Sequence, residues 1–414
     1  MFLLLYPGIG IKRWLALGAL GVLLVALGIA FAVSASITSA VVEVGRTLTF
    51  GGWLTGVQRG AIFGTLGLAT ASFAAYMLYR RIVFGARYTQ RGVLENLSSN
   101  RLRRGGPRVV AVGGGTGLST LLRGVKEYTE DITAIVTVAD DGGSSGRLRA
   151  ELGIPPPGDA RQCLIALSES EPLMEEMLSH RFPGNEGSLG GHSLGNLLLA
   201  ALAETRGGFP EALQAAAELL AVRGHVMPSS TASDLKLVAR TASGRVLEGE
   251  TAIGQAGEAI DELWLDPADC EAYGGAVSAI EAADAIVIGP GSLYTSVLPN
   301  FLVPGIREAV ARSRALKVFV CNIATQHGET DGLSVADHLR IFLQHARVPV
   351  THVVVNSNAI PIGPEHHQEP LAYTDRIDGY RGVVLHSDLV DASFPSRHDS
   401  KKLSAVINRI ARER

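Results

Sequence analysis

The chain has 414 residues, with 37 basic and 40 acidic side chains and a formal net charge of −3. This length exceeds what one domain usually needs, and the balanced charge gives no indication of nucleic-acid binding. The three cysteines, Cys163, Cys270 and Cys321, lie far apart and form no CxxC pair. The usual spacing of a structural zinc or thioredoxin-like centre is therefore absent, and we expect three buried, reduced thiols.

Two uncharged segments occur near the beginning of the chain. No charged residue lies between positions 14 and 42 or between 60 and 79, and each segment reaches the roughly 20 residues that span a bilayer. A signal peptide is the alternative for the first segment, because Lys12 and Arg13 precede it. The second segment favours a hairpin with spans over about 14–36 and 60–79, in which Gly60-x-x-x-Gly64 would let the helices approach closely.

The charges that flank these segments predict their orientation. Basic residues precede the first span and follow the second, whereas the connecting loop holds only Glu43, Arg46 and Arg59. The positive-inside rule then places both termini in the cytoplasm. After the membrane hairpin of residues 1–79, residues 80–106 form a basic linker. This linker either attracts anionic lipid head groups or only fixes the topology.

Five later stretches have the pattern of a buried strand that runs into a loop of small polar residues. They are Val109–Gly117, Ile132–Gly146, Ala285–Ser292, Val318–Thr330 and His352–Asn358. Continuous Val/Ile/Ala strands are typical of a parallel sheet that is buried on both faces. Because the loops at the carboxyl ends of parallel strands share one edge, we expect them to converge on one site for an anionic ligand.

Amphipathic segments alternate with these strands, so residues 107–414 are expected to form one α/β domain. Residues 235–253 alternate about Ser243-Gly244 and predict a β-hairpin insertion. Asp159 and Ser193 are candidate helix N-caps, and Ser292 is a third, before a helix that starts in GPGS. The predicted fold is a Rossmann-like, mostly parallel sheet with helices on both faces and a β-hairpin insertion, preceded by two transmembrane helices.

The glycine-rich loop Gly113–Gly117 follows the first strand. It departs from the dinucleotide fingerprint GxGxxG because Leu118 occupies the third glycine position, and it lacks the lysine of a P-loop. We therefore expect no nicotinamide cofactor. The loop's backbone amides at a helix N-terminus still suit an anion, and a tight strand-to-helix turn is the alternative.

The adjacent acids Asp140 and Asp141 end the second strand. Two neighbouring carboxylates repel each other unless water or a cation compensates, and Mg²⁺ prefers such oxygen ligands together with phosphate. They are candidate metal ligands, or they diverge in a solvated turn. His192-Ser193 does not match a nucleophile motif, and the sequence identifies no catalytic residue.

Several motifs occur together and in one order. GGGTGLSTLLRG, VTVADDGGSSGRLR, PPGDARQCL, GHSLGNLLL, GPGSLYTSVLPN and NIATQHGETDG resemble those of the YvcK-type gluconeogenesis factors. These form the UPF0052 branch of the superfamily that includes the CofD 2-phospho-L-lactate transferases. The resemblance covers roughly residues 107–400. It implies a Rossmann-like fold with a site for a UDP-sugar or related nucleotide, and a role in cell shape and gluconeogenic growth.

The resemblance and the converging loops together predict the binding residues. Tyr294 is expected to stack on a base or a sugar, with a core tyrosine as the alternative. The predicted ligand-binding residues are Gly113, Gly114, Gly115, Thr116, Gly117, Ser144, Ser145, Asn196, Gly289, Gly291, Ser292, Tyr294, Asn322 and Thr325.

Two functions follow from this interpretation. The favoured one is a regulatory protein that binds a UDP-sugar and is tethered to the bacterial plasma membrane with its α/β domain in the cytoplasm. The alternative is a Mg²⁺-dependent, CofD-like transferase acting on a nucleotide-activated substrate. Membrane lipids are expected partners, and self-association is left open.

Overall fold

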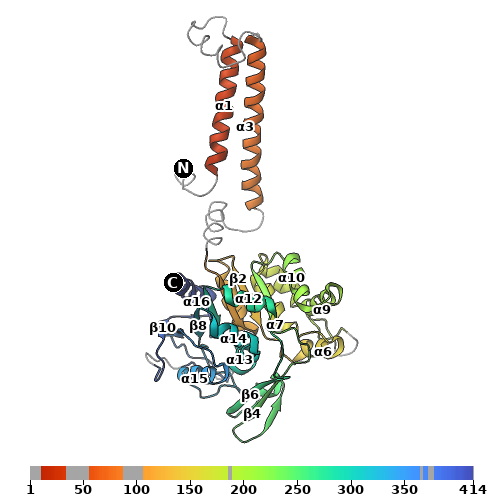
Figure 1. Ribbon diagram of the computed structural model, residues 1–414, viewed down its shortest axis with the longest axis vertical. Helices are drawn as coiled ribbons and strands as arrows, with labels where there is room; N and C mark the ends of the chain where they lie inside the picture. The colour runs from red at the N-terminus through yellow and green to blue at the C-terminus, as the bar shows by residue number, and fades with distance from the viewer. Residues whose placement is uncertain are drawn as a thin grey trace. The chain divides into compact units, whose positions relative to one another are not determined.

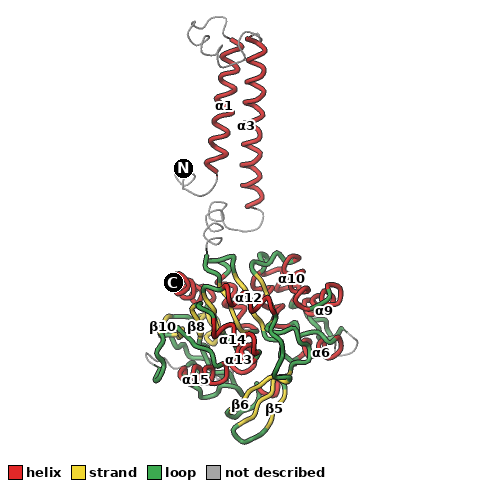
Figure 2. Tube along the Cα trace, in the orientation of Figure 1, coloured by secondary structure: helices red, strands yellow, loops and turns green. Residues whose placement is uncertain are grey.

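A computed structural model describes residues 11–33, 56–86, 106–184, 189–363, 367–371 and 377–413. Contacts within the chain divide it into two compact units, Met1–Arg101 and Leu102–Arg414 (Figure 1). The described residues of the first unit are helical, and the second unit contains every described strand (Figure 2).

The described part of the first unit consists of two long helices, α1 (Ile11–Val33) and α3 (Gly56–Ala86), which pack against each other. Their closest approach is at Gly21 and Gly67, because a Cβ on Gly67 would lie 2.7 Å from both the Gly21 carbonyl oxygen and the Val25 nitrogen. A Cβ on Gly64 would meet nothing within 4 Å. The close approach among the described residues is thus at Gly67, three residues further along α3, and close packing at Gly64 stays a prediction.

Both helices contain apolar stretches within the predicted spans. Among the described residues, Gly60–Met77 of α3 is long and apolar enough to cross a membrane, and α1 contributes the apolar stretch Leu17–Leu27. Large apolar side chains such as Leu23, Leu68 and Phe73 are exposed on the pair. Residues 34–36 of the first predicted span and 87–105 of the basic linker lie outside the described residues.

The packing of α1 on α3 gives a direct prediction. A Cβ on Gly18 would lie 3.9 Å from the Ala74 Cβ, within the 3.5–4.5 Å range of disulfides. We expect Gly18→Cys/Ala74→Cys to form an intramolecular disulfide under mild oxidation, detected as a thiol-dependent shift in gel mobility. Gly18→Cys/Gly64→Cys is the control and should not cross-link. Equal cross-linking of both pairs would contradict this helix register.

The second unit is built on a seven-stranded sheet in the order β10-β9-β8-β7-β1-β2-β3, with every neighbouring pair parallel. The order reverses between β1 and β7, because β2 and β3 extend the sheet to one side and β8, β9 and β10 to the other. The strands are β1 (Val109–Gly113), β2 (Ile132–Val136), β3 (His225–Pro228), β7 (Ala285–Ile288), β8 (Leu316–Val320), β9 (His352–Asn356) and β10 (Val383–Ser387).

Helices cover both faces of this sheet, as predicted (Figure 1). Successive residues of the strands point alternately into two separate cores: Val110 and Val112 into one, Val109 and Ala111 into the other. The first core contains residues of α12 (Gly274–Ala282), α13 (Leu298–Leu302), α14 (Pro304–Arg312) and α15 (Val335–Ala346). The second contains residues of α5 (Gly115–Val125), α7 (Gly158–Leu167), α9 (Leu194–Arg206), α10 (Phe209–Leu219) and α16 (Ser400–Arg412).

The late helix α16 packs directly against α5, the first helix of the α/β domain. The contact is closest at Gly124, where an added Cβ would overlap the Ser400 carbonyl oxygen and the Ser404 side chain. Asp399 caps α16 by accepting hydrogen bonds from the N–H groups of Lys401 and Lys402. The buried faces of both helices contribute leucines, Leu121 and Leu403 among them, to one core.

The predicted β-hairpin is present as β4 (Lys236–Thr241) and β5 (Val246–Glu248), which pair in antiparallel fashion. A third strand, β6 (Ile260–Asp266), pairs with the other side of β4. The insertion is thus a three-stranded antiparallel sheet in the order β5-β4-β6, which projects from the lower end of the domain in Figure 1. The short helix α11 (Glu250–Ile253) connects β5 to β6.

Candidate ligand-binding site

A cavity of about 270 Å³ opens at the carboxyl edge of the parallel sheet. It is lined by the loops that follow β1, β7 and β8, so it lies at the position where the strand order reverses. Open α/β sheets bind ligands at such a position, because the two adjacent loops turn to opposite faces and leave a crevice between them. We call this cavity the switch-point pocket.

Backbone contacts between the loops set the shape of the switch-point pocket. A Cβ on Gly117 would lie 2.5 Å from the Pro290 carbonyl oxygen, so the loop after β1 can approach the loop after β7 only with glycine here. Asn322 connects the loops after β7 and β8: its Oδ1 accepts from the Gly291 N–H at 3.2 Å, and its Nδ2 donates to the Gly291 oxygen at 2.9 Å. Ser292 Oγ donates to Gln326 Oε1 at 2.5 Å.

The structure brings eight of the predicted ligand-binding residues to this pocket. They are Gly114, Gly115, Thr116, Gly117, Gly291, Ser292, Asn322 and Thr325. Gly113 lies in β1 and Gly289 in the turn after β7, next to the lining but outside it. Ser292 does not cap a helix through its side chain, because the following residues form a π-helical turn, η2 (Leu293–Val297), and its hydroxyl group bonds to Gln326.

Tyr294 is placed away from the switch-point pocket. Its side chain is 3% exposed and its ring meets the His345 ring edge-on, with centroids 6.2 Å apart. Burial raises the pKa of its phenol to about 12. This position favours the alternative of a core tyrosine over the prediction that Tyr294 stacks on a ligand, because the ring lies outside the switch-point pocket and lines a separate cavity with Glu329 and His345.

The sequence analysis missed a group of lining residues near the C-terminus. Ser396, Arg397 and His398 belong to β12 (Phe394–His398), which pairs with β11 (Val390–Asp391), and they contribute to the switch-point pocket. Burial lowers the pKa of His398 to about 4, so this side chain is neutral. Arg397 is exposed, with its guanidinium 5.2 Å from the centre of the Phe394 ring. It supplies a cation beside the glycine-rich loop.

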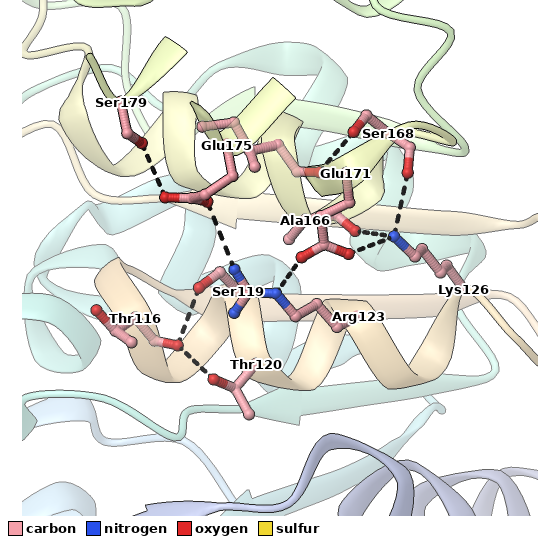
Figure 3. A network of polar contacts seen from close by, with 11 residues as sticks. Thr116, Ser119, Thr120, Arg123, Lys126, Ala166, Ser168, Glu171, Glu175 and Ser179 are labelled. Atoms are coloured by element: carbon pink, nitrogen blue, oxygen red, sulfur yellow. Dashed lines mark hydrogen bonds and ion pairs between the residues drawn. The ribbon is translucent and has the colours of Figure 1, made fainter. Parts of the chain in front are cut away.

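The helix that begins in this loop is fixed at its other end by an ion-pair network, which Figure 3 shows. Arg123 of α5 pairs with Glu171 of α8 (Glu171–Leu178), and the buried Lys126 donates to Glu171 at 2.9 Å and to the Ser168 oxygen at 3.1 Å. Because these groups are largely removed from solvent, the network holds α5 against α8 more firmly than a surface ion pair does. The N–H groups at the start of α5 are thereby held at the pocket.

An acidic cluster of Asp140, Asp159 and Glu250 lies next to this loop. Burial raises the pKa of Asp140, and burial with the Asp140 charge raises that of Asp159 to about 7. Burial and the charges of both aspartates raise the pKa of Glu250 to about 9. Among the described residues, no three His, Cys, Asp or Glu side chains are arranged as a metal site.

Asp140 and Asp141 do not act as a pair. Asp140 accepts from the Gly142 N–H at 2.7 Å and belongs to the acidic cluster, whereas the exposed Asp141 accepts from the N–H and hydroxyl of Thr251, both at 3.0 Å. Both acids lie in the loop after β2, which ends at Val136, and their different backbone and side-chain donors hold the two carboxylates apart. Besides burial, the Asp141 charge still contributes to the raised pKa of Asp140, and the Asp140 charge contributes to that of Asp159.

Asp159 was predicted to cap a helix, and this prediction is wrong. The helix α7 begins one residue earlier, at Gly158, after Pro157, and has no side-chain cap. The Asp159 carboxylate turns instead toward the glycine-rich loop, where it accepts a hydrogen bond from the Gly115 N–H. By contrast, Ser193 caps α9 as predicted, accepting from the Asn196 N–H at 3.3 Å.

The predicted residues Ser144, Ser145 and Asn196 form a buried polar cluster apart from the switch-point pocket. Ser144 Oγ lies 3.0 Å from His192 Nδ1 and accepts from Asn196 Nδ2 at 3.1 Å. The Ser145 hydroxyl bonds to Asp140, which lowers the pKa of that carboxyl and partly opposes the effect of burial. The cluster therefore helps to position the Asp140 carboxylate through the Ser145 hydroxyl group.

The acidic cluster predicts a pH-dependent stability in metal-free buffer. Folding raises the pKa values of Asp159 and Glu250 above their ordinary values near 4. The folded state then binds more protons than the unfolded chain, and stability falls as pH rises from about 4 toward 9. Urea unfolding with EDTA should give a lower free energy of unfolding at pH 8.5 than at pH 5.5. Asp159→Asn should flatten this slope and Asp141→Asn should not; equal slopes in both variants would contradict the prediction.

Comparison with known proteins agrees with this fold. The family model described as 2-phospho-L-lactate transferase CofD matches residues 109–378. A crystal structure of a UPF0052 family member from Bacillus halodurans superposes with a TM-score of 0.69 and 45% identity, over 73% of this chain and 99% of that one. The fold and site thus define a Rossmann-like α/β protein with its pocket at the switch point.

Proteins named as gluconeogenesis factors are similar over long stretches. The Bacillus subtilis gluconeogenesis factor is 51% identical over 62% of this chain and 80% of its own length. A putative gluconeogenesis factor from Clostridium acetobutylicum is 42% identical over 97% of this chain and 90% of its own length. The chain belongs to the CofD family, in its UPF0052 branch of YvcK-type gluconeogenesis factors.

Proposed function

We propose that the protein is a regulatory protein of gluconeogenic growth and cell-envelope synthesis that binds a UDP-sugar in the switch-point pocket. The observation that carries this proposal is the pairing of the glycine-rich loop with Arg397 across one cavity. Backbone N–H groups at a helix N-terminus and a guanidinium are the two groups that bind a diphosphate most directly. At about 270 Å³ the pocket holds the diphosphate, and the base and sugar extend along its rims.

Mg²⁺ is the proposed metal partner of this ligand. Asp140 and Asp159 would supply two carboxylate oxygens beside the glycine-rich loop, and the diphosphate would supply others, which is how Mg²⁺ is commonly bound. The raised pKa values of both acids fit this role, because burial disfavours their charged forms, Asp140 also repels Asp159, and a cation would relieve both effects. Asp141, which bonds to Thr251, is not included.

The N-terminal helices are proposed to anchor the protein in a bacterial plasma membrane. The apolar segment Gly60–Met77 and the exposed apolar side chains of both helices support this. A reporter fused after residue 414 should then report a cytoplasmic location. A periplasmic signal would contradict the hairpin topology.

The UDP-sugar proposal is tested by thermal shift of the full chain in detergent. A panel of UDP-sugars is compared with UDP and the free sugars, since a ligand at 100 times its Kd stabilises by about 2.7 kcal/mol. We expect Arg397→Ala to weaken binding at least tenfold, whereas Arg314→Ala, which removes an arginine from a different cavity, should leave it unchanged. No stabilisation by any UDP-sugar would overturn the proposal.

A transferase is the second candidate, because the acidic cluster lies next to the proposed diphosphate site. Asp159, with a pKa of about 7, is able to accept a proton near neutral pH. Release of UMP or UDP from a UDP-sugar, dependent on Mg²⁺ and lost in Asp159→Asn, would favour an enzyme over a binding protein.

A further inference from the structure

A groove runs along the free edge of β6 and shares no lining residue with the switch-point pocket. It consists of two adjoining cavities of about 610 Å³ and about 270 Å³, which share Asp261, Gln344 and His345 in their linings. One wall is β6 itself, which has a strand beside it on one side only in the described part of the chain. We call this feature the β6 groove.

A free strand edge presents backbone N–H and C=O groups that can pair with another chain. Proteins commonly use such an edge to bind an extended peptide, with main-chain hydrogen bonds for affinity and flanking pockets for specificity. The side chains of Leu263 and Leu265 in β6 are buried, and this packing holds the strand in place. Its edge faces the ends of α13, α14 and α15, which form the opposite wall.

One end of the β6 groove is acidic. Glu329 is 7% exposed; its Oε1 accepts from the Tyr294 N–H at 2.7 Å, and its Oε2 has no partner in good hydrogen-bond geometry among the described residues. Burial raises the pKa of this carboxyl to about 7, although the nearby Tyr294, Ser292 and Thr295 donors oppose the rise, so a bound cation would favour its charged form. Asp261 lies where the two cavities meet, and its side chain makes no hydrogen bond or ion pair among the described residues. The other charged residues at this end, Glu258, Asp331 and Arg340, are already paired within the described chain. A buried carboxylate oxygen without a partner is costly, so this end is suited to a cationic side chain.

The other end of the groove is basic. Arg307 and Arg347 line it, and neither forms an ion pair within the described chain. Arg347 adopts a left-handed conformation, with φ of 52°, at the C-terminus of α15. Glycine is usually favoured at this position because it lacks a Cβ. The arginine here adds a cation to the groove at the expense of some backbone strain.

We propose that the β6 groove binds an extended segment of a partner protein. This segment pairs with the edge of β6, directs a basic side chain toward Asp261 and Glu329, and directs an acidic one toward Arg307 and Arg347. A strand-shaped wall with opposite charges at its two ends matches a peptide that carries both charges. An anionic membrane or a nucleic acid would meet repulsion at the acidic end.

The groove is connected to the switch-point pocket through one loop. Glu329 lies at one side of the loop after β8, and Thr325 and Gln326 of that loop line the pocket. Glu329 also holds the first turn of η2, while Ser292, just before η2, bonds to Gln326. This step rests on the proposed UDP-sugar function. A peptide bound in the β6 groove would then change the affinity of the switch-point pocket for its UDP-sugar.

The test selects linear peptides from an unbiased phage library on the full chain in detergent micelles. We expect enriched peptides that carry both a basic and an acidic residue, and at least tenfold weaker binding when alternate peptide nitrogens are methylated. Asp261→Lys should weaken binding at least tenfold. Arg347→Gly should do the same without loss of stability, because glycine prefers this backbone conformation. Glu248→Lys, a charge reversal on β5 at the opposite edge of the same sheet, is the matched control.

Three results would overturn the proposal: no enriched sequence, enriched peptides that bind Asp261→Lys and Arg347→Gly as tightly as the unmodified chain, or insensitivity to N-methylation. Analytical sedimentation of the chain without peptide tests whether the chain associates with itself. Self-association that Asp261→Lys abolishes would show that a second copy occupies the groove. Thermal shift with UDP-sugars on the same variants keeps the two hypotheses apart, since neither substitution lies in the switch-point pocket.

Discussion

Gly117→Val should reduce the affinity for a UDP-sugar by more than a hundredfold, about 2.7 kcal/mol. The Cβ of any residue at this position would lie 2.5 Å from the Pro290 carbonyl oxygen and 2.8 Å from the Gly291 nitrogen. These are backbone atoms and cannot rotate away, so the loops after β1 and β7 must separate. Calorimetric titration of the full chain measures the loss, and circular dichroism establishes that the domain remains folded.

A matched control for this substitution exists in the same domain. A Cβ on Gly274, at the beginning of α12, would meet nothing within 4 Å. Gly274→Val should therefore leave UDP-sugar affinity unchanged. If Gly117→Val binds as tightly as Gly274→Val, the glycine-rich loop is a structural turn, and the proposed ligand lies elsewhere.

Tyr294→Ala should lower the free energy of unfolding by about 3–5 kcal/mol, the usual cost of removing a large aromatic side chain from a core. The ring is 3% exposed and belongs to the core that also contains Leu293, Leu298 and Phe301. Its removal enlarges the cavity that the ring lines together with His345 of α15. Chemical denaturation measures the change, and calorimetry at a temperature where the variant is folded should give nearly unchanged affinity.

The conservative variant separates packing from polar effects at this position. Tyr294→Phe keeps the ring and should cost less than about 1.5 kcal/mol. A tenfold loss of UDP-sugar affinity in Tyr294→Ala with little destabilisation would restore the view that Tyr294 contacts the ligand.

The parallel sheet was predictable because its central strands consist almost entirely of apolar residues. Every residue of Val109–Val112 and Ala285–Ile288 is buried, as expected for strands of a sheet that is covered on both faces. The outer strands lack such a continuous apolar pattern. β3 contains His225 and Pro228, and β10 is only partly buried, because an edge strand has fewer neighbours. β6 was missed because its charged residues interrupt the apolar pattern.

The candidate site was predictable where one loop supplies several residues in sequence, as in Gly114–Gly117. It was not predictable where distant segments meet. Arg397 lies about 280 residues beyond Gly117 and belongs to a short ribbon whose sequence resembles a surface turn. The direction of Asp159 depends on where α7 begins, and a shift of one residue turns its side chain from a cap toward the Gly115 N–H.

The packing of α16 on α5 has a consequence for synthesis on the ribosome. The pocket combines the first loop of the α/β domain with Arg397, and the helix that carries this loop is covered by residues 400–412. The nascent domain therefore lacks both a complete pocket and a covered α5 until nearly 300 residues after Gly115 have left the exit tunnel. Ligand cannot stabilise an unfinished chain, and a premature stop before Ser400 would leave the apolar face of α5 open to chaperones and proteases.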